Sequence, residues 1–168
     1  MATQYLGIDP GLTGAWTLLD VHGALIACSL VPVFGTKGKR VVDLASLVAQ
    51  LRFVVKPDAS IVAALEQVGA MPGQGVTSMF TFGRTVGAWD GIIAAHGWRR
   101  VDVRPQAWTK LVPGGRIDKK IDRKAAAAHT ARGLWPTLPL ERVKDYALAD
   151  AALIAEWARQ QDVAAART

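Results

Sequence analysis

Two acidic residues each follow a short apolar run, where an acid is energetically unusual. Asp9 follows the run at residues 5–8 and precedes a Pro-Gly turn, and Glu66 follows the run at residues 60–65. A buried carboxylate is costly unless a cation or hydrogen bonds compensate it. An acid at the end of a buried strand therefore indicates a metal ligand or a phosphate-handling group. Because Asp-Pro-Gly is also ordinary turn chemistry, the first motif alone leaves both interpretations open.

Two further acids lie in the last predicted helix, over residues 145–159. Asp150 interrupts an otherwise apolar Ala/Leu surface, which marks it more strongly than an acid on a charged face. Asp145 is five residues earlier, about 140° round the helix axis, so the two share a face poorly. We expect Asp145 at the helix start or N-cap, from where it can lean towards a metal bound by Asp150. An ion pair with the adjacent Lys144 is the alternative.

Together Asp9, Glu66, Asp145 and Asp150 are the candidate catalytic groups and metal ligands. Carboxylates without a thiol cluster favour hard cations, Mg²⁺ or Mn²⁺. Two such ions, about 3.5–4 Å apart, would support phosphodiester hydrolysis. One ion lowers the pKa of a water nucleophile, and the other stabilises the leaving 3′-oxygen. The alternative is that these acids only pair with nearby Lys and Arg side chains.

The order of predicted elements indicates an α/β fold with a mixed sheet. Apolar patterns predict strands over residues 4–9, 15–20, 24–31, 60–65 and 98–103, and helices over residues 41–56, 77–95, 105–111, 119–132 and 145–159. A three-strand meander followed by strand–helix alternation predicts five strands flanked by helices. If the first and fourth strands pair in parallel, Asp9 and Glu66 emerge at the same edge of the sheet.

Charge is concentrated in one part of this 168-residue chain, which we expect to form a single domain over residues 1–168. The net charge is +6, and residues 97–133 contain ten Lys or Arg against three Asp. Such a basic block favours a polyanionic partner, most often nucleic acid, although a solvated helix face is the alternative. No apolar run approaches the about 18 residues of a membrane span. We therefore predict no membrane partner.

The cysteine content and the N-terminal residues favour an intracellular protein. Cys28 is the only cysteine, so the chain has neither an intrachain disulfide nor a cysteine-based zinc site. The first nine residues lack the basic and apolar regions of a signal peptide. We expect a cytoplasmic location, in a bacterium or a phage-infected host, in association with DNA.

Four segments carry a family resemblance. They read GIDPGLTGAW at residues 7–16, ALEQV at 64–68, FGRTVGAWDGI at 82–92 and DYALADAALIAEW at 145–157. In this order and spacing the chain resembles RuvC-type Holliday-junction resolvases of the ribonuclease H-like superfamily, especially phage-encoded members. The first segment alone could belong to an actin-like sugar kinase, whereas four segments in order span nearly the whole chain.

The resemblance implies a ribonuclease H-like fold and a homodimer that nicks a four-way DNA junction symmetrically, leaving 5′-phosphate and 3′-hydroxyl ends. By position Asp9 and Glu66 match the first two catalytic acids, and Asp150 matches the last. Asp145 matches less closely, since bacterial members place their paired helix acids three apart, where this chain has Ala147. Its wider spacing looks like that of some phage and organellar relatives.

Basic residues near the scissile phosphate are also implied. Lys119 and Lys120 are the candidates for a catalytic role, and general phosphate contact is the alternative. The predicted DNA contacts are Lys37, Lys39, Arg40, Met71, Arg84, Arg116, Lys119, Lys120, Arg123 and Lys124. Bacterial members carry a stacking aromatic shortly after the catalytic Glu, where this chain reads GAMP at residues 69–72. Met71 is the residue that can form a wedge there instead.

Three other functions compete with junction cleavage. The same acids suit a nuclease for RNA–DNA hybrids or flaps, and the basic surface alone would suffice for a non-catalytic binder of branched DNA. An actin-like phosphotransferase is disfavoured by length, and no second phosphate-binding Gly turn follows a later strand.

Gly83 and Gly87, one turn apart on the middle helix, would permit close helix–helix approach at the implied dimer interface.

Overall fold

The central sheet has five strands in the order β3-β2-β1-β6-β7 in the computed structural model, which describes residues 2–36, 39–67, 69, 73, 75–113 and 120–167. The strands are β1 (Thr3–Asp9), β2 (Ala15–Leu19), β3 (Leu25–Leu30), β6 (Ser60–Glu66) and β7 (Arg99–Val103). The first three pair antiparallel, whereas β6 pairs in parallel with both β1 and β7. The predicted meander with two parallel strands is confirmed.

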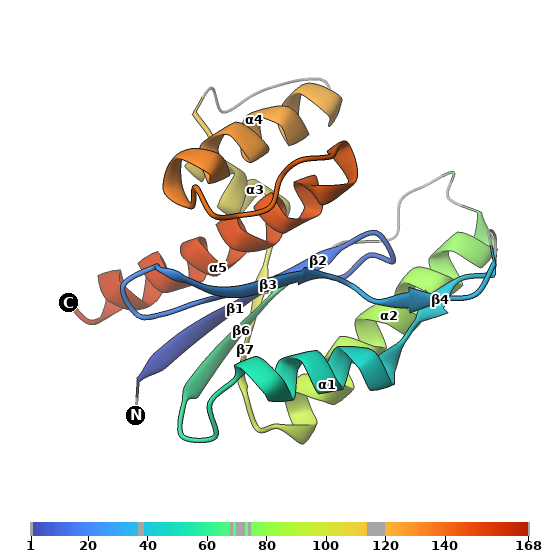
Figure 1. Cartoon of the computed structure of the whole chain (residues 1–168), viewed down its shortest axis with the longest axis horizontal. Helices are drawn as coiled ribbons and strands as arrows, with labels where there is room; N and C mark the ends of the chain where they lie inside the picture. Colours follow the sequence, from blue (N-terminus) through green and yellow to red (C-terminus); the bar gives the residue numbers. More distant parts are fainter. Residues whose placement is uncertain are drawn as a thin grey trace.

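Helices cover both faces of this sheet (Figure 1). One face carries α1 (Leu44–Val54) and α2 (Val76–Ala95), and the other carries α3 (Pro105–Trp108), α4 (Lys120–Leu134) and α5 (Tyr146–Ala165). Short 3₁₀ turns, η1 (Thr109–Leu111) and η2 (Val143–Asp145), follow α3 and precede α5. Alternation along β1 sends Leu6 and Ile8 into one apolar core and Tyr5 into the other.

The start of α1 differs from the prediction by three residues. Val41–Val42 form strand β5, which pairs with β4 (Val33–Phe34) in a separate two-stranded sheet. The Asp43 carboxylate then accepts a hydrogen bond from the Ser46 backbone N–H at 3.0 Å and caps the helix. The two valines favour a strand, and the cap fixes the first residue of the helix.

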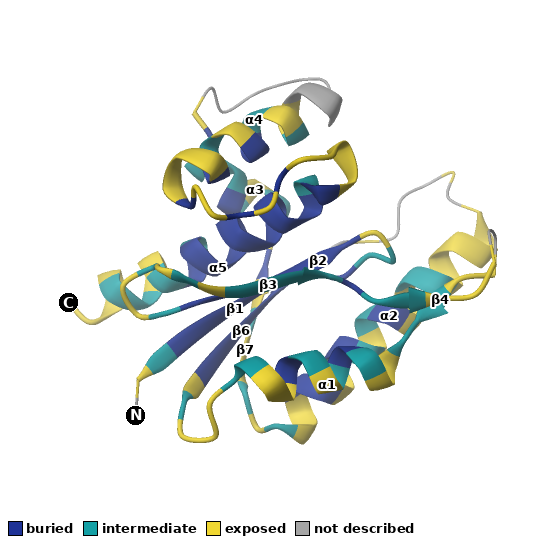
Figure 2. Cartoon of the chain, in the orientation of Figure 1, coloured by how far each residue is buried: buried dark blue, intermediate teal, exposed yellow. Residues whose placement is uncertain are grey.

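Helix α5 lies unusually close to strand β1 because of Gly7. A Cβ atom at this glycine would lie 2.0 Å from the Ala151 carbonyl oxygen and 2.5 Å from the Ala155 backbone nitrogen. Small side chains on α5 allow the same approach from the helix, and the N-terminal half of α5 is buried (Figure 2). This contact brings the fourth predicted motif against the first. None of the helices in the described ranges is long and apolar enough to span a membrane.

Candidate active site

Asp9 and Glu66 end neighbouring parallel strands, as their positions in the sequence predict. Ile8 of β1 lies opposite Leu65 of β6, so the next residue of each strand emerges at the same edge of the sheet. The chain then turns tightly after β1, where the Gly11 backbone N–H donates to Asp9 Oδ1 at 3.4 Å. The two carboxylates are close enough for the charge of Asp9 to raise the pKa of Glu66.

The third acid at this edge is Asp150, which α5 carries against the sheet. Its side chain is buried, and the charges of Asp9 and Glu66 both act on it. Helix α4 contributes a cation to the same place, because Lys124 Nζ lies 3.6 Å from Asp150 Oδ2. Three carboxylates from β1, β6 and α5 are thus gathered beside one lysine.

Burial shapes the protonation of two of these acids. Loss of hydration raises the pKa of Glu66 to about 7, and the Asp9 charge adds to the rise, while the Trp108 hydrogen bond, Lys124 and Arg123 oppose it. Loss of hydration likewise raises the pKa of Asp150 to about 7; Lys124 opposes this rise, and Asp9 and Glu66 reinforce it. Without a cation, ionisation of all three acids is therefore unfavourable at this edge.

This donor set consists of carboxylate oxygens, which are the ligands that hard divalent cations prefer. A bound cation would also offset the repulsion between the three carboxylates. Asp9, Glu66 and Asp150 are the residues that would hold such an ion. As they stand, no three carboxylate, imidazole or thiol side chains within the described ranges are arranged to hold a metal ion. Binding would thus require these side chains to close around the ion and Lys124 to release Asp150.

Asp145 is at the start of α5, as predicted, but its carboxylate has a different partner. Oδ2 accepts hydrogen bonds from the backbone N–H and Nε of Arg142, and Oδ1 accepts one from the Arg142 guanidinium at 2.8 Å. These hydrogen bonds lower the pKa of Asp145. The largest effect on this pKa is the Arg142 hydrogen bond, so Arg142 is the partner that the structure gives Asp145, and its role as a metal ligand stays a prediction.

The predicted DNA contacts are distributed over both faces of the sheet. On α4, Arg123 is exposed and Lys124 reaches Asp150, and Lys120 is the first residue of the helix. On the opposite face, Lys39, Arg40 and Arg84 are exposed around the β4–β5 hairpin and α2. The remaining predictions, Lys37, Met71, Arg116 and Lys119, lie outside the described residues.

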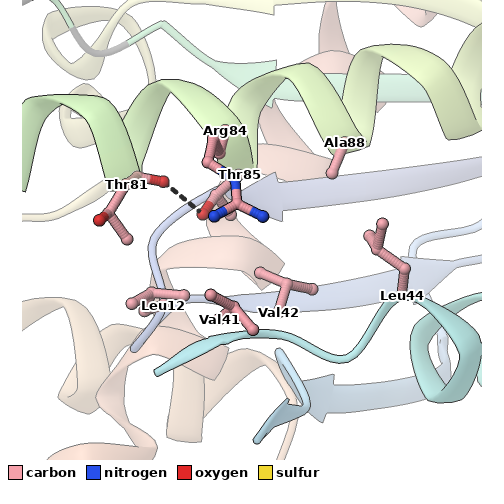
Figure 3. Close-up of a pocket in the computed structure, with 8 residues that line it drawn as sticks. All are labelled: Leu12, Val41, Val42, Leu44, Thr81, Arg84, Thr85 and Ala88. Carbon is pink, nitrogen blue, oxygen red and sulfur yellow. Dashed lines mark hydrogen bonds between the residues drawn. The ribbon is translucent and has the colours of Figure 1, made fainter. Parts of the chain in front are cut away.

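A small cavity of about 50 Å³ lies between α2 and the β4–β5 hairpin (Figure 3). Leu12, from the turn that follows Asp9, forms part of its wall together with apolar residues of the hairpin. Arg84 lies across this cavity and also places its guanidinium 6.0 Å from the centre of the Phe80 ring. The described residues that line it include no carboxylate, so the cavity is separate from the acidic trio.

Sequence reasoning missed Trp108, whose indole Nε1 donates to Glu66 Oε1 at 2.8 Å. A tryptophan in an apolar segment is expected in the core, and Trp108 is indeed buried. The available signal was its position: Val103 of β7 lies opposite Glu66, and Pro105 starts a helix two residues later. A side chain in the first turn of that helix is therefore near the end of β6.

Comparison with known proteins identifies the fold. No protein-family model and no curated protein matches the chain. T. thermophilus RuvC in complex with a Holliday junction substrate matches with a TM-score of 0.64 and 18% identity, over 97% of this chain and 96% of that chain. A second Thermus thermophilus RuvC structure gives a TM-score of 0.54 and 20% identity, over 98% and 97%. The chain therefore has the RuvC-type, ribonuclease H-like fold that its four sequence motifs predict.

Proposed function

We propose that this protein is a structure-selective endonuclease that resolves four-way DNA junctions by symmetric, metal-dependent nicking. The observation that carries the proposal is the convergence of Asp9, Glu66 and Asp150 beside Lys124 on α4. The chain that carries this arrangement has a fold similar to that of a protein whose structure was solved in complex with a Holliday junction substrate. The products would be 5′-phosphate and 3′-hydroxyl ends, formed by one domain over residues 1–168.

The acidic trio would hold Mg²⁺ or Mn²⁺, two ions per site. Bound ions of this kind supply a water nucleophile of lowered pKa and stabilise the leaving 3′-oxygen. Asp9 and Glu66, fixed at the ends of paired strands, set the geometry, and Asp150 completes the donor set from α5. Lys124 neutralises Asp150 before the cation arrives and is then available to the phosphate. Lys119 and Lys120 are the further basic residues proposed near the scissile phosphate.

DNA would cross the edge of the sheet where these acids emerge. Helix α4, which carries Arg123 and Lys124, covers one face of the sheet, and α2 and the β4–β5 hairpin cover the other (Figure 1). Arg84 belongs to α2, and Lys39 and Arg40 belong to the loop between β4 and β5. Phosphate contacts from both sides would position the backbone without reading its sequence. Lys37, Met71, Arg116, Lys119 and Lys120 complete the proposed contact surface.

A homodimer is the assembly proposed for cutting two strands of one junction. The first half of α2 exposes Val76 and Phe80, with 84% and 67% of their surfaces accessible, in a helix that is mostly uncharged. A Cβ atom at Gly83 or Gly87 would meet nothing within 4 Å, so these glycines face open space. Such a face suits close packing against a second copy of α2.

The decisive experiment is cleavage of an end-labelled synthetic four-way junction with Mg²⁺ or Mn²⁺. Linear duplex, a flap and an RNA–DNA hybrid serve as competing substrates, and Asp9→Asn serves as the control protein. We expect paired, symmetric nicks in the junction alone, and none with Asp9→Asn, while that variant still binds the junction. Binding should weaken steeply with salt, because phosphate contacts release counterions.

Other outcomes would identify the competing functions. Cleavage of hybrids or flaps in preference to the junction would assign the same acids to another ribonuclease H-like nuclease. Tight junction binding without cleavage under either metal, unchanged in Asp9→Asn and Glu66→Gln, would indicate a non-catalytic binder of branched DNA. Either result would contradict the resolvase proposal.

A further inference from the structure

The hydrogen bond between Trp108 and Glu66 joins the hydrophobic core to the acidic trio. Nε1 of the indole donates to Oε1 of the carboxylate at 2.8 Å. Among the residues that the structure describes, no other group donates a hydrogen bond to Glu66. A glutamate has three side-chain torsions, so one well-aligned donor decides which orientation its carboxylate adopts.

Trp108 is itself held rigidly. Only 5% of its surface is accessible, and it belongs to the core cluster between the sheet and α4–α5. Its helix, α3, starts directly after β7, and the Thr109 hydroxyl donates to the Pro105 carbonyl oxygen at 2.8 Å across this turn. The indole N–H therefore has a fixed position at the end of β6.

Glu66 lacks this rigidity of its own. It is the last residue of β6 and is partly accessible, so the packing that fixes the apolar side chains of β6 ends before it. A metal ligand at such a position depends on a partner that holds the oxygen not used for the ion. Trp108 supplies this kind of partner from the core.

We propose that Trp108 is a positioning residue that holds Glu66 through Oε1 and so presents Oε2 to a divalent cation. This inference rests on the proposed function, because it concerns the same acidic trio. It predicts that removing only the indole N–H weakens cation binding while the fold and the junction affinity are retained.

Trp135 provides a matched control elsewhere in the same core. It is also 5% accessible, and its Nε1 donates to the Gly23 carbonyl oxygen at 2.8 Å. Replacement of either tryptophan by phenylalanine removes one indole hydrogen bond and a similar volume. The two variants should thus lose similar stability and differ only in which acceptor loses its hydrogen bond, Glu66 Oε1 or the Gly23 carbonyl oxygen.

The test compares Trp108→Phe and Trp135→Phe in the full chain by calorimetric titration with Mn²⁺. We expect Trp108→Phe to bind Mn²⁺ roughly 10–100-fold more weakly, as for other partners of metal ligands. It should need correspondingly more Mn²⁺ for half-maximal junction cleavage, while its junction affinity in EDTA stays at the wild-type value. Trp135→Phe should change none of these quantities. Equal Mn²⁺ affinities for the two variants would overturn the inference.

A second substitution covers the case in which phenylalanine disturbs folding. Incorporation of 3-benzothienylalanine at position 108 keeps the bicyclic shape and removes the N–H donor, and it should reproduce the loss of Mn²⁺ affinity. In a ¹⁵N spectrum of the indole groups, Glu66→Ala should shift the Trp108 resonance and leave that of Trp135 in place. An unmoved Trp108 resonance would contradict the hydrogen bond itself.

These readouts separate the two proposals. Weaker Mn²⁺ binding by Trp108→Phe, in a protein that cleaves no junction, would retain the positioning role and reject the resolvase function. If the wild type cleaves the junction and Trp108→Phe binds Mn²⁺ as tightly as the wild type does, the positioning role is rejected and the resolvase function is retained.

Discussion

Lys124 of α4 and Asp150 of α5 form an ion pair, with Nζ 3.6 Å from Oδ2, at the edge where Asp9 and Glu66 emerge. The pair places a protein cation beside the donor set proposed for a metal. Lys124 also lowers the pKa of both Glu66 and Asp150. Its charge therefore helps to keep these carboxylates ionised and able to bind a cation.

Replacing Lys124 with methionine should move the rise of cleavage activity to higher pH. Without the ammonium group, the pKa values of Glu66 and Asp150 rise further, so a higher pH is needed to ionise them. The measurement is the single-turnover rate on saturating junction between pH 5.5 and 9. Arg123→Met is the control, since Arg123 lowers the pKa of Glu66 less than Lys124 does. A larger shift for Arg123→Met would contradict this prediction.

Asp145→Asn should lower thermal stability and leave junction cleavage active, whereas Asp150→Asn should abolish cleavage. The Arg142 hydrogen bonds lower the folded-state pKa of Asp145, so its stabilising contribution is fully present at pH values above the pKa of an aspartate in the unfolded chain. That contribution is lost as the pH falls through the folded-state value. The difference in melting temperature between wild type and Asp145→Asn should therefore narrow below about pH 4. An inactive Asp145→Asn protein would indicate a direct catalytic role instead.

In EDTA, the wild-type protein should lose stability as the pH rises from 5 to 8. Glu66 and Asp150 have folded-state pKa values of about 7, above those of an unfolded chain, so the native state binds more protons in this interval. One unit of pKa difference corresponds to about 1.4 kcal/mol. In urea unfolding, the free energy of unfolding of Asp150→Asn relative to that of the wild type should therefore increase by at least about 1 kcal/mol between pH 5 and pH 8. A constant difference between the two proteins would refute the raised pKa of Asp150.

Gly7→Ala should cost about 3 kcal/mol or more in the free energy of unfolding, because overpacking forces backbone shifts. Its methyl group would lie 2.0 Å from the Ala151 carbonyl oxygen and would push α5 away from β1. Displacement of α5 also moves Asp150, so cleavage should fall together with stability. Gly133→Ala on α4 is the control, since a Cβ there meets nothing within 4 Å. It should stay within about 1 kcal/mol of wild type.

Gly87→Leu should weaken the proposed homodimer at least about tenfold by crowding the exposed face of α2. The apparent association constant can be measured by sedimentation equilibrium. Gly133→Leu adds the same side chain at another open glycine, on α4, and should leave the association unchanged. A Gly87→Leu protein that remains fully dimeric would place the interface elsewhere.

The sequence was most informative where local pattern and pairing agree. Asp9 and Glu66 could be placed together because parallel strands end at a common edge, and Asp150 because an acid interrupts an apolar helix face. The sequence suggests Lys144 as the ion-pair partner of Asp145, whereas Arg142, three residues away, reaches the carboxylate through the turn before α5. Trp108 was missed because its role depends on β7 lying beside β6, which no local pattern specifies.

The position of Gly7 against Ala151 also bears on protein synthesis. Asp9 lies in the first strand and Asp150 in the last helix, so the acidic trio is complete only when α5 has docked on β1. A chain still being translated carries β1, β6 and the basic residues of α4 before α5 has left the ribosome. For the proposed nuclease, such a nascent chain could hold nucleic acid without its third carboxylate. Cleavage would thus begin only after α5 has emerged and docked on β1.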